Sequence, residues 1–350
     1  MGDALTGTTA GPLDYDGFGG YALQATTLGE LSSGGLTAER TRPQGRTSWP
    51  SRRTTWRTSP QDRAGEVRPA RRALVRDLAS PDVVALEEVQ DDDGATDDGV
   101  VSAGVTLKKL TEAIRAAGGP AYEWRQIDPA DKQDGGEPGG NIRTAFLFNP
   151  ERVSFTDIPG GDATTPVTVG GGEGAVELSA SPGRIDPANS AWNDSRKPLV
   201  GEFSFRGRPV FVVANHFNSK GGDQPWTAGS SPGPVLGDPA RRAGRRGGRL
   251  RARATGRGPG RGGGRGGRPE RLPVLPALAG LTEDGALTDL VERLPRDERY
   301  GYVYNGNSQV LDHILTSRAL ARPDYDIVHV NAEFADQSSD HDPQVVRLRP

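Results

Sequence analysis

Acidic residues and histidines of this chain recur beside short apolar runs, an arrangement that suits hydrolytic chemistry. The clearest case lies near the C-terminus, where Asp340, His341, Asp342 and Pro343 precede the alternating run 344–348, which is expected to form the closing strand. A carboxylate able to bind a metal and an imidazole that titrates near neutral pH stand side by side there, on an edge that a strand would hold rigid. A plain polar turn before a last strand would look the same, so this motif needs support from elsewhere in the chain.

Other ionisable residues occupy comparable places. They are Glu88, His216 and Asp312, at or near the ends of the apolar runs 83–86, 210–214 and 310–315. A charged group in such a run is costly unless it is paired or binds a cation. One such residue is ordinarily a satisfied core group, but the repetition along the whole chain favours a shared site.

Sequence periodicity predicts the elements that position these residues. The unbroken apolar run 83–86 is typical of a strand buried on both faces, and Leu107, Leu110 and Ile114 recur at helical spacing. Residues 199–205 and 210–214 alternate around a short turn, which predicts a hairpin. Further strands are expected at 141–148, 310–315, 327–330 and 344–348. Strands separated by long excursions favour a mixed sheet, or a pair of sheets, with outer helices.

The composition limits the chemistry available to such a site. The 350 residues have a formal net charge of −3 and include no cysteine, which excludes disulfides, thiol nucleophiles and cysteine-ligated zinc. A metal is then expected on oxygen ligands, as are Mg²⁺, Mn²⁺ and Ca²⁺. No apolar run approaches the roughly 20 residues of a membrane span, and no export signal follows Met1, so we expect no membrane partner and infer no obligate protein partner.

Four motifs, in order along the chain, resemble those of the endonuclease/exonuclease/phosphatase superfamily. They are Val84-Ala85-Leu86-Glu87-Glu88-Val89-Gln90, Asn215-His216-Phe217, Leu311-Asp312-His313-Ile314-Leu315 and Ser339-Asp340-His341-Asp342-Pro343. The strand that begins Asn141-Ile142-Arg143 and the segment Ser195-Arg196-Lys197-Pro198 are similar to the large extracellular nucleases of bacteria within that superfamily. The resemblance covers residues 73–230 and 275–350.

The resemblance implies a fold and a function. The fold would be a four-layer α/β sandwich of two mixed β-sheets flanked by helices. The chain would be a divalent-metal-dependent phosphodiester hydrolase, with Mg²⁺ or else Mn²⁺ or Ca²⁺, and most simply a secreted or cell-surface nuclease with DNA or RNA as substrate. A phosphodiesterase or phosphatase of the same fold that acts on a non-nucleic substrate is the alternative.

The resemblance also implies a role for each site residue. Glu88 would ligate the cation, with Asp340 completing its oxygen shell. Asp312 would hold His341 in the tautomer that takes a proton from water, and His216 would face the phosphate as donor or acid. The phosphate-binding residues would be Arg143, Arg196 and Asn215. Hard oxygens for Mg²⁺, a carboxylate-oriented imidazole and guanidinium groups for phosphoryl oxygens are suited to these tasks.

The chain departs from the superfamily pattern in three places. Glu87 stands where the residue before the metal ligand is usually Gln. The opening strand near Tyr-Asn-Val-Glu-Asn is absent, and so is the Gly-Asp-x-Asn-Asp segment. These two gaps coincide with residues 46–72 and 241–273, whose composition fits no period of 2 or 3.6.

Both gaps can be filled by a shift of reading frame. With GC-biased synonymous codons chosen for the purpose, residues 46–59 read in one shifted frame can give Asp-Val-Leu-Ala-Val-Ala-Thr-Tyr-Asn-Val-Glu-Asn-Leu, the missing strand and motif. In the other shifted frame, residues 265–273 can read Val-Ala-Gly-Asp-Leu-Asn-Asp-Phe. We therefore hypothesise paired, compensating frame changes around each stretch, and we expect the chain as written to be impaired.

The expected organisation has two parts. Residues 1–45 read as a remnant of an upstream β-rich or linker region, and residues 46–350 as the hydrolase-like domain, with 46–72 and 241–273 atypical and poorly ordered. Residues 241–271 contain twelve Arg against one acidic residue, Glu270. Arg/Gly-rich segments of this kind also bind RNA or single strands, so a non-catalytic nucleic-acid binder is a further alternative.

Overall fold

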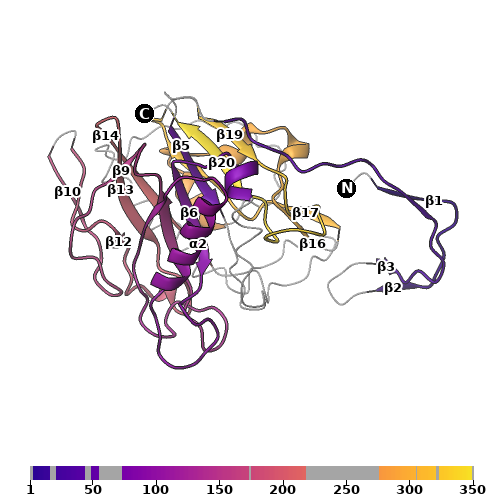
Figure 1. Ribbon diagram of the computed structural model, residues 1–350, viewed down its shortest axis with the longest axis horizontal. Helices are drawn as coiled ribbons and strands as arrows, with labels where there is room; N and C mark the ends of the chain where they lie inside the picture. The colour runs from indigo at the N-terminus through magenta and orange to yellow at the C-terminus, as the bar shows by residue number, and fades with distance from the viewer. Residues whose placement is uncertain are drawn as a thin grey trace.

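Two β-sheets dominate the computed structural model, which describes residues 3–15, 21–43, 49–54, 73–172, 175–217, 276–304, 306–320 and 323–348. The larger sheet has the strand order β19-β20-β5-β6-β8-β7 (Figure 1). Its strands are β5 (Trp49–Thr54), β6 (Val83–Val89), β7 (Glu123–Gln126), β8 (Arg143–Phe148), β19 (Asp324–Ile327) and β20 (Gln344–Leu348). Strands β5 and β6 run parallel while their neighbours pair antiparallel, so this sheet is mixed.

Strand β6 lies between two hydrophobic cores, as its unbroken apolar run predicted. Val83 and Ala85 pack into one core, and Val84 and Leu86 pack into the other. Successive side chains of a strand point to opposite faces, which explains the alternation. Each fully buried aliphatic side chain of this kind contributes about 1.5–3 kcal/mol, so a central strand with both faces covered is firmly held.

A helix covers one face of this sheet. Helix α2 (Gly104–Ala116) buries Leu107, Leu110 and Ile114 in the same core as Val84 and Leu86, together with the short turn η1 (Ala73–Asp77). The predicted helix is confirmed. Its exposed side carries Lys108 and Glu112, one turn apart, so the apolar stripe is the face that packs.

The second sheet packs on the opposite face. It has the order β12-β13-β14, with β9 paired to β13, and its strands are β9 (Ser154–Phe155), β12 (Gly183–Arg184), β13 (Leu199–Phe205) and β14 (Arg208–Ala214). The expected hairpin is confirmed, and Phe203 meets Phe146 of β8 edge to face at 5.4 Å. Its named strands pair antiparallel, and an isolated parallel bridge joins Arg184 of β12 to Pro166, so a second mixed sheet stays a prediction.

The described layers are therefore one helical layer and two sheets. The chain is a strand-rich mixed α/β fold with few helices, α2 and α4 (Pro276–Thr282) being the α-helices of the described part. A four-layer sandwich flanked by helices on both outer faces stays a prediction. None of the helices in the described ranges is long and apolar enough to cross a membrane.

Two of the predicted strands are wrong in position. Residues 310–314 have no regular structure, and β18 covers Leu315–Ser317. The backbone carbonyl of Asp312 accepts a hydrogen bond from the side-chain amide of Gln344, and its carboxylate pairs with the ring of His341. Bonds to side chains therefore take the place of strand-to-strand backbone hydrogen bonds at Asp312. The strand expected at 327–330 ends at Ile327, because side-chain carboxylates take over the backbone N–H groups beyond it: that of His329 donates to Glu39, and those of Val330 and Asn331 donate to Asp342.

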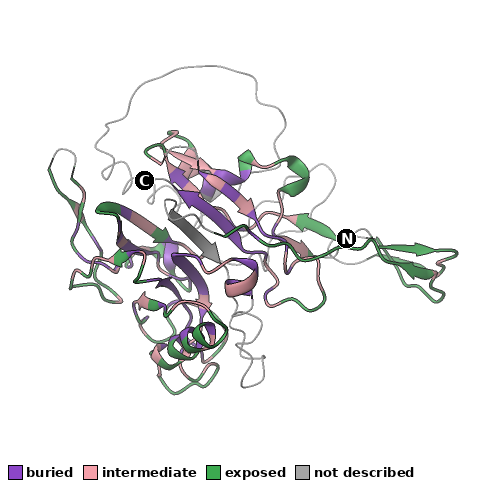
Figure 2. Ribbon diagram, turned by 45° about the horizontal axis from the view of Figure 1, so that its top comes forward, coloured by how far each residue is buried: buried purple, intermediate pink, exposed green. Residues whose placement is uncertain are grey.

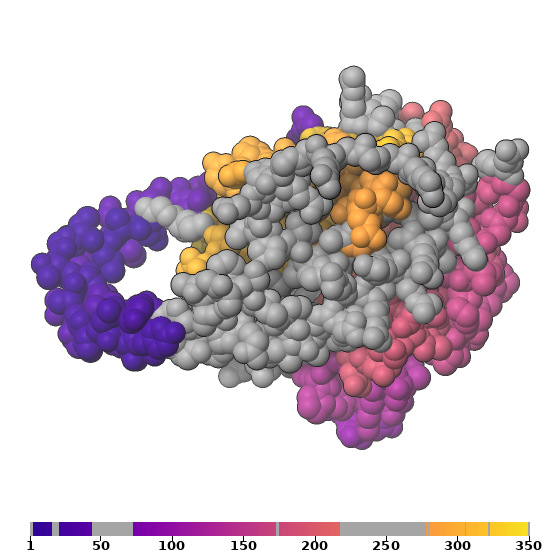
Figure 3. All heavy atoms as spheres, turned by 180° about the vertical axis from the view of Figure 1, so that it is seen from behind, coloured from indigo at the N-terminus to yellow at the C-terminus, as the bar shows by residue number. Residues whose placement is uncertain are grey.

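The remaining described elements are short. They are β1 (Ala4–Thr6), β2 (Leu13–Tyr15), β3 (Tyr21–Leu23), β4 (Glu30–Ser32), β10 (Val169–Gly170), β11 (Glu177–Leu178), β15 (Leu287–Asp289), β16 (Tyr302–Tyr304), β17 (Asn307–Gln309), η2 (Ser190–Trp192), η3 (Leu290–Arg293) and η4 (Arg296–Glu298). Strands β1 to β4 form two ribbons with exposed faces, and they stand clear of the body as an arm (Figures 2 and 3). Residues 55–72 and 241–273, on which the frame hypothesis and the Arg/Gly alternative depend, lie outside the described residues.

Candidate active site

Asp312 and His341 form the first of two acid–imidazole pairs made of predicted site residues. The Nδ1 atom of His341 lies 2.5 Å from Oδ2 of Asp312. The carboxylate is an acceptor, so the neutral ring carries its proton on Nδ1 and directs a lone pair outward from Nε2. The His341 side chain keeps 22% of its surface exposed. This tautomer and this exposure suit a general base.

The backbone of His341 is pinned from several sides. Its carbonyl accepts from the side-chain amide of Asn331 at 2.7 Å, and its N–H donates to the hydroxyl of Ser339. The next N–H, of Asp342, donates to the carbonyl of Gly301 at 2.7 Å. The ring of Tyr302 contacts the imidazole with centroids 4.9 Å apart. The ring is thus held in place through its backbone, its Nδ1 and one face.

Carboxylates around His341 change its proton affinity. Burial lowers the pKa of His341, but the hydrogen bond and charge of Asp312, together with the charges of Asp340 and Glu87, outweigh burial and raise the pKa above its ordinary value. Glu87 belongs to β6, so its effect on His341 brings the end of β6 and the residues before β20 into one electrostatic environment.

The second pair joins Glu88 of β6 to His216, which follows β14. The Nε2 atom of His216 lies 3.5 Å from Oε1 of Glu88. On the other side of the ring, Nε of Arg196 donates to Nδ1 of His216 at 3.0 Å. A guanidinium cannot accept, so the neutral His216 carries its proton on Nε2, the nitrogen that faces Glu88. Arg196 thereby fixes His216 as a donor toward the carboxylate side.

Glu88 occupies an irregular point of its strand. The register of β6 on β8 shifts between Leu86 and Val89, and Glu88 itself has a φ of 54°. A β-bulge re-aims a side chain, and a non-glycine residue with positive φ stores strain that the surroundings must offset. Such strain is often found at functional positions. The bulge ends the run of residues that alternate into the two cores.

The donors present fit a cation that needs few protein ligands. No group of three or more His, Cys, Asp or Glu side chains within the described ranges is close enough to hold a metal ion. Mg²⁺ usually takes one or two carboxylates, completed by waters and substrate phosphate oxygens. Glu88, about a quarter exposed at 24%, offers such a carboxylate. Asp340, a part-buried neighbour of His341, is the second acidic residue expected here.

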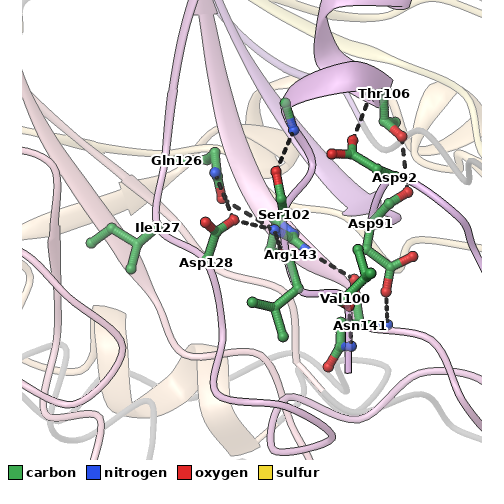
Figure 4. A network of polar contacts seen from close by, with 12 residues as sticks. Asp91, Asp92, Val100, Ser102, Thr106, Gln126, Ile127, Asp128, Asn141 and Arg143 are labelled. Carbon is green, nitrogen blue, oxygen red and sulfur yellow. Dashed lines mark hydrogen bonds and ion pairs between the residues drawn. The ribbon is translucent and has the colours of Figure 1, made fainter. Parts of the chain in front are cut away.

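Arg143 lies in a different environment from the one that a phosphate-binding role suggests. Only 1% of it is exposed, and its guanidinium donates to the side chain of Asp128 and to the carbonyls of Val101 and Asn141 (Figure 4). Arg143 therefore ties together the loops around β8. Asp128 also lines a surface hollow that none of the predicted site residues lines.

The other two phosphate candidates differ in exposure. Arg196 is buried, and besides its bond to His216 it donates to the carbonyl of Phe217 at 2.5 Å. Asn215 is part-buried, directly before His216 and after the last residue of β14. Both therefore lie beside the second pair, whereas the network around Arg143 involves neither pair.

A third acid–imidazole pair, which the sequence did not indicate, supports the loop behind His341. His329 Nδ1 lies 3.0 Å from Oδ2 of Asp342, and the ring of Tyr300 stacks on that of His329 at 4.2 Å. The other oxygen of Asp342 accepts from the backbone N–H groups of Val330, Asn331 and Ala332. A signal existed, since Asp342 lies in the same motif as His341, but no local pattern connects it with residues 329–332.

Comparison with known proteins places this geometry in context. The family model "Endonuclease/Exonuclease/phosphatase family" matches residues 61–341. No curated protein matches the chain. Among solved structures, it is similar to an endonuclease/exonuclease/phosphatase family protein from Leptotrichia buccalis C-1013-b, with 10% identity, a TM-score of 0.46, and coverage of 85% of this chain and 99% of that one.

Two further solved structures are similar. The human Nocturnin catalytic domain has 13% identity, a TM-score of 0.47, and coverage of 85% of this chain and 93% of that one. The AP endonuclease LMAP from Leishmania major has 13% identity, a TM-score of 0.45, and coverage of 86% of this chain and 88% of that one.

Replacing Asp312 by Asn will lower the pKa of His341, because the pair loses its charge. In the parent chain, the stabilisation by Asp312 is complete below the unfolded histidine pKa of about 6.5 and is lost as pH rises through the raised folded value. The free energy of unfolding of D312N will therefore differ most from the parent at about pH 5.5 and least at about pH 8.5. NMR titration of the histidines and denaturation at both pH values measure this; the exposed Asp297→Asn is the control, and an unchanged His341 pKa would refute the coupling.

Replacing Asp342 by Ala will destabilise the fold by about 3–5 kcal/mol, because it leaves His329 and three backbone N–H groups without their acceptor. Urea denaturation followed by circular dichroism measures the loss. Asp336→Asn, an exposed residue of the same loop, is the matched control and should stay within about 0.5 kcal/mol of the parent. A loss for D342A no larger than that of the control would show that the Asp342 clamp is not stabilising.

Proposed function

The chain belongs to the endonuclease/exonuclease/phosphatase family, and from this membership we propose that it is a divalent-metal-dependent phosphodiesterase that acts on nucleic acid. By family it is a hydrolase of the phosphodiesterase/nuclease type. The enzymes of this family are generally divalent-metal-dependent. The observation that carries the proposal is the Asp312–His341 pair, which shares an electrostatic environment with Glu87, the neighbour of Glu88. Mg²⁺ is the cation that we propose, and DNA or RNA the substrate, with the secreted or cell-surface setting of extracellular nucleases.

The proposed proton transfers follow from the two tautomers. His341, with its proton on Nδ1 held by Asp312, accepts a proton from water through Nε2 as that water attacks phosphorus. His216, with Nε2–H on the carboxylate side, donates to a phosphoryl or leaving oxygen. A bound cation held by Glu88 and Asp340 would supply electrostatic stabilisation of the charge that develops on the phosphoryl oxygens.

The phosphate-binding roles are proposed in modified form. Arg196 acts on phosphate through His216, whose orientation it fixes, and Asn215 stands next to that histidine. Arg143 acts as a positioning residue, because its donors are directed to protein groups. A guanidinium enclosed in this way costs too much to expose for a substrate contact, since each buried charge depends on its partners.

Replacing Glu88 by Gln will weaken binding of Mg²⁺ or Mn²⁺ at least about tenfold, which corresponds to about 1.4 kcal/mol, because the charge of the ligand is lost. Titration calorimetry with the metal alone measures this without turnover. Glu112→Gln, an exposed change on α2, should bind as the parent does. Equal affinity of the Glu88 variant and the parent would remove Glu88 from the metal site.

The chain as written will hydrolyse single- or double-stranded DNA and RNA very slowly, because the two family motifs missing from 46–72 and 241–273 normally supply further metal and phosphate ligands. Restoring both reading frames will recover Mg²⁺-dependent hydrolysis. A nuclease assay on the two versions, with His341→Gln in the restored version as the inactive control, measures this. Robust turnover by the chain as written, or codons that cannot yield the missing motifs in the shifted frames, would contradict the frame hypothesis.

A further inference from the structure

Three alternate tyrosines line up beside the histidines of the candidate site. They are Tyr300, two residues before the start of β16, and Tyr302 and Tyr304, the two ends of β16. Residues two apart in a strand share a face. The ring of Tyr300 stacks on His329, the ring of Tyr302 contacts His341, and the ring of Tyr304 lies nearly parallel to that of Tyr302, with an interplanar angle of 8° and centroids 6.4 Å apart.

The three rings differ in how much of them is covered. Tyr300 is fixed by its bond to Glu333 at 2.9 Å, and Tyr302 lies between Tyr304 and the imidazole of His341. Tyr304 is 49% exposed. Among the large hydrophobic residues exposed in the described ranges, it is the only aromatic one outside the N-terminal arm. The row of aromatic rings therefore runs from the imidazole of His341 through Tyr302 to Tyr304, a residue that is about half exposed to solvent.

We propose that Tyr304, supported by Tyr302, is a stacking subsite for a nucleobase next to the phosphodiester that water attacks with His341 as its general base. The inference rests on the proposed function and narrows its substrate to one that has bases, in preference to a non-nucleic phosphodiester. An aromatic ring takes any base, because every base has a π-face, and the resulting affinity is tolerant of sequence. Burial in the core does not account for this arrangement, since Tyr304 keeps 49% of its surface exposed.

The hairpin β16–β17, which carries Tyr302 and Tyr304, is suited to hold a base beside the candidate site. Strand β16 pairs with β17, with Tyr302 opposite Gln309 and Tyr304 opposite Asn307. A single backbone bridge connects Tyr302 to His341. The hairpin lies at the margin of the body, beside the C-terminal strands (Figure 1). A base on Tyr304 would thus be held relative to the imidazole by main-chain pairing, which is the rigid support that a substrate subsite needs.

The test measures binding by the full chain and does not depend on its turnover. The probe is a short single-stranded oligodeoxynucleotide with phosphorothioate linkages that contains the fluorescent base 2-aminopurine. It is compared, in Mg²⁺, with an abasic oligomer of the same length and charge. The variants are Tyr304→Ala and, as the matched control that keeps the ring, Tyr304→Phe. Circular dichroism checks that each variant is folded.

We expect Tyr304→Ala to weaken binding of the base-containing oligomer about 5- to 150-fold and to reduce the quenching of 2-aminopurine, because stacking on the ring is lost. Tyr304→Phe should bind as the parent does, and the abasic oligomer should bind all three proteins equally. The inference alone is overturned if both oligomers bind but Tyr304→Ala changes neither. If neither oligomer binds the parent chain, the proposed function fails, and this subsite fails with it.

Discussion

The positions of the candidate site residues relative to one another depend on one central place in the larger sheet, the one between β20 and β6. Strand β5 lies between β20 and β6, antiparallel to the first and parallel to the second. The residues before β20 supply His341, and the end of β6 supplies Glu88. Without a strand in that slot, both neighbours would present an unpaired edge, and the two acid–imidazole pairs would have no fixed relation. Backbone pairing in the centre of the sheet is thus the constraint from which the chemistry follows.

The residues that occupy this slot are poorly matched to it. The sequence of β5 is Trp49-Pro50-Ser51-Arg52-Arg53-Thr54, and a proline is ordinarily confined to edge strands or bulges because it has no N–H for the ladder. Natural sequences tend to agree with their fold at every level, so a local conflict in a central strand calls for a cause. The hypothesised frame change would provide one, since synonymous codons for these residues can be chosen so that the shifted frame reads Leu-Ala-Val-Ala-Thr-Tyr-Asn. The place of β5 in the sheet and the hypothesised shifted-frame sequence both favour a strand at this point of the chain.

The sequence predicted well the elements whose apolar pattern is decided locally. The run that became β6, the stripe that became α2, and the hairpin β13–β14 depend on side chains that contact one or two nearby elements, so periodicity is informative there. The segment around Asp312 was predicted as a strand and is not one, because its carbonyl and carboxylate bond to Gln344 and His341, which are about thirty residues away. The placement of Arg143 was unpredictable for the same reason: a guanidinium before a strand can point to a phosphate or to loops, and only the position of Asp128 decides between them.

Pairing of an imidazole with a carboxylate does not by itself mark a catalytic residue in this fold. All four histidines have such a partner, at 3.5 Å for His216, 2.8 Å for His313, 3.0 Å for His329 and 2.5 Å for His341. What separates them is the rest of the environment. His329 is only 6% exposed, and its partner Asp342 also accepts from three backbone N–H groups, so that pair stabilises a loop. The His341 side chain keeps 22% of its surface exposed, is held through its backbone by that same loop, and lies in the electrostatic environment of Glu87, next to the bulge at Glu88. A histidine that is held on one side and open on the other can exchange protons with a substrate, and the buried pair behind it is the support that such an arrangement requires.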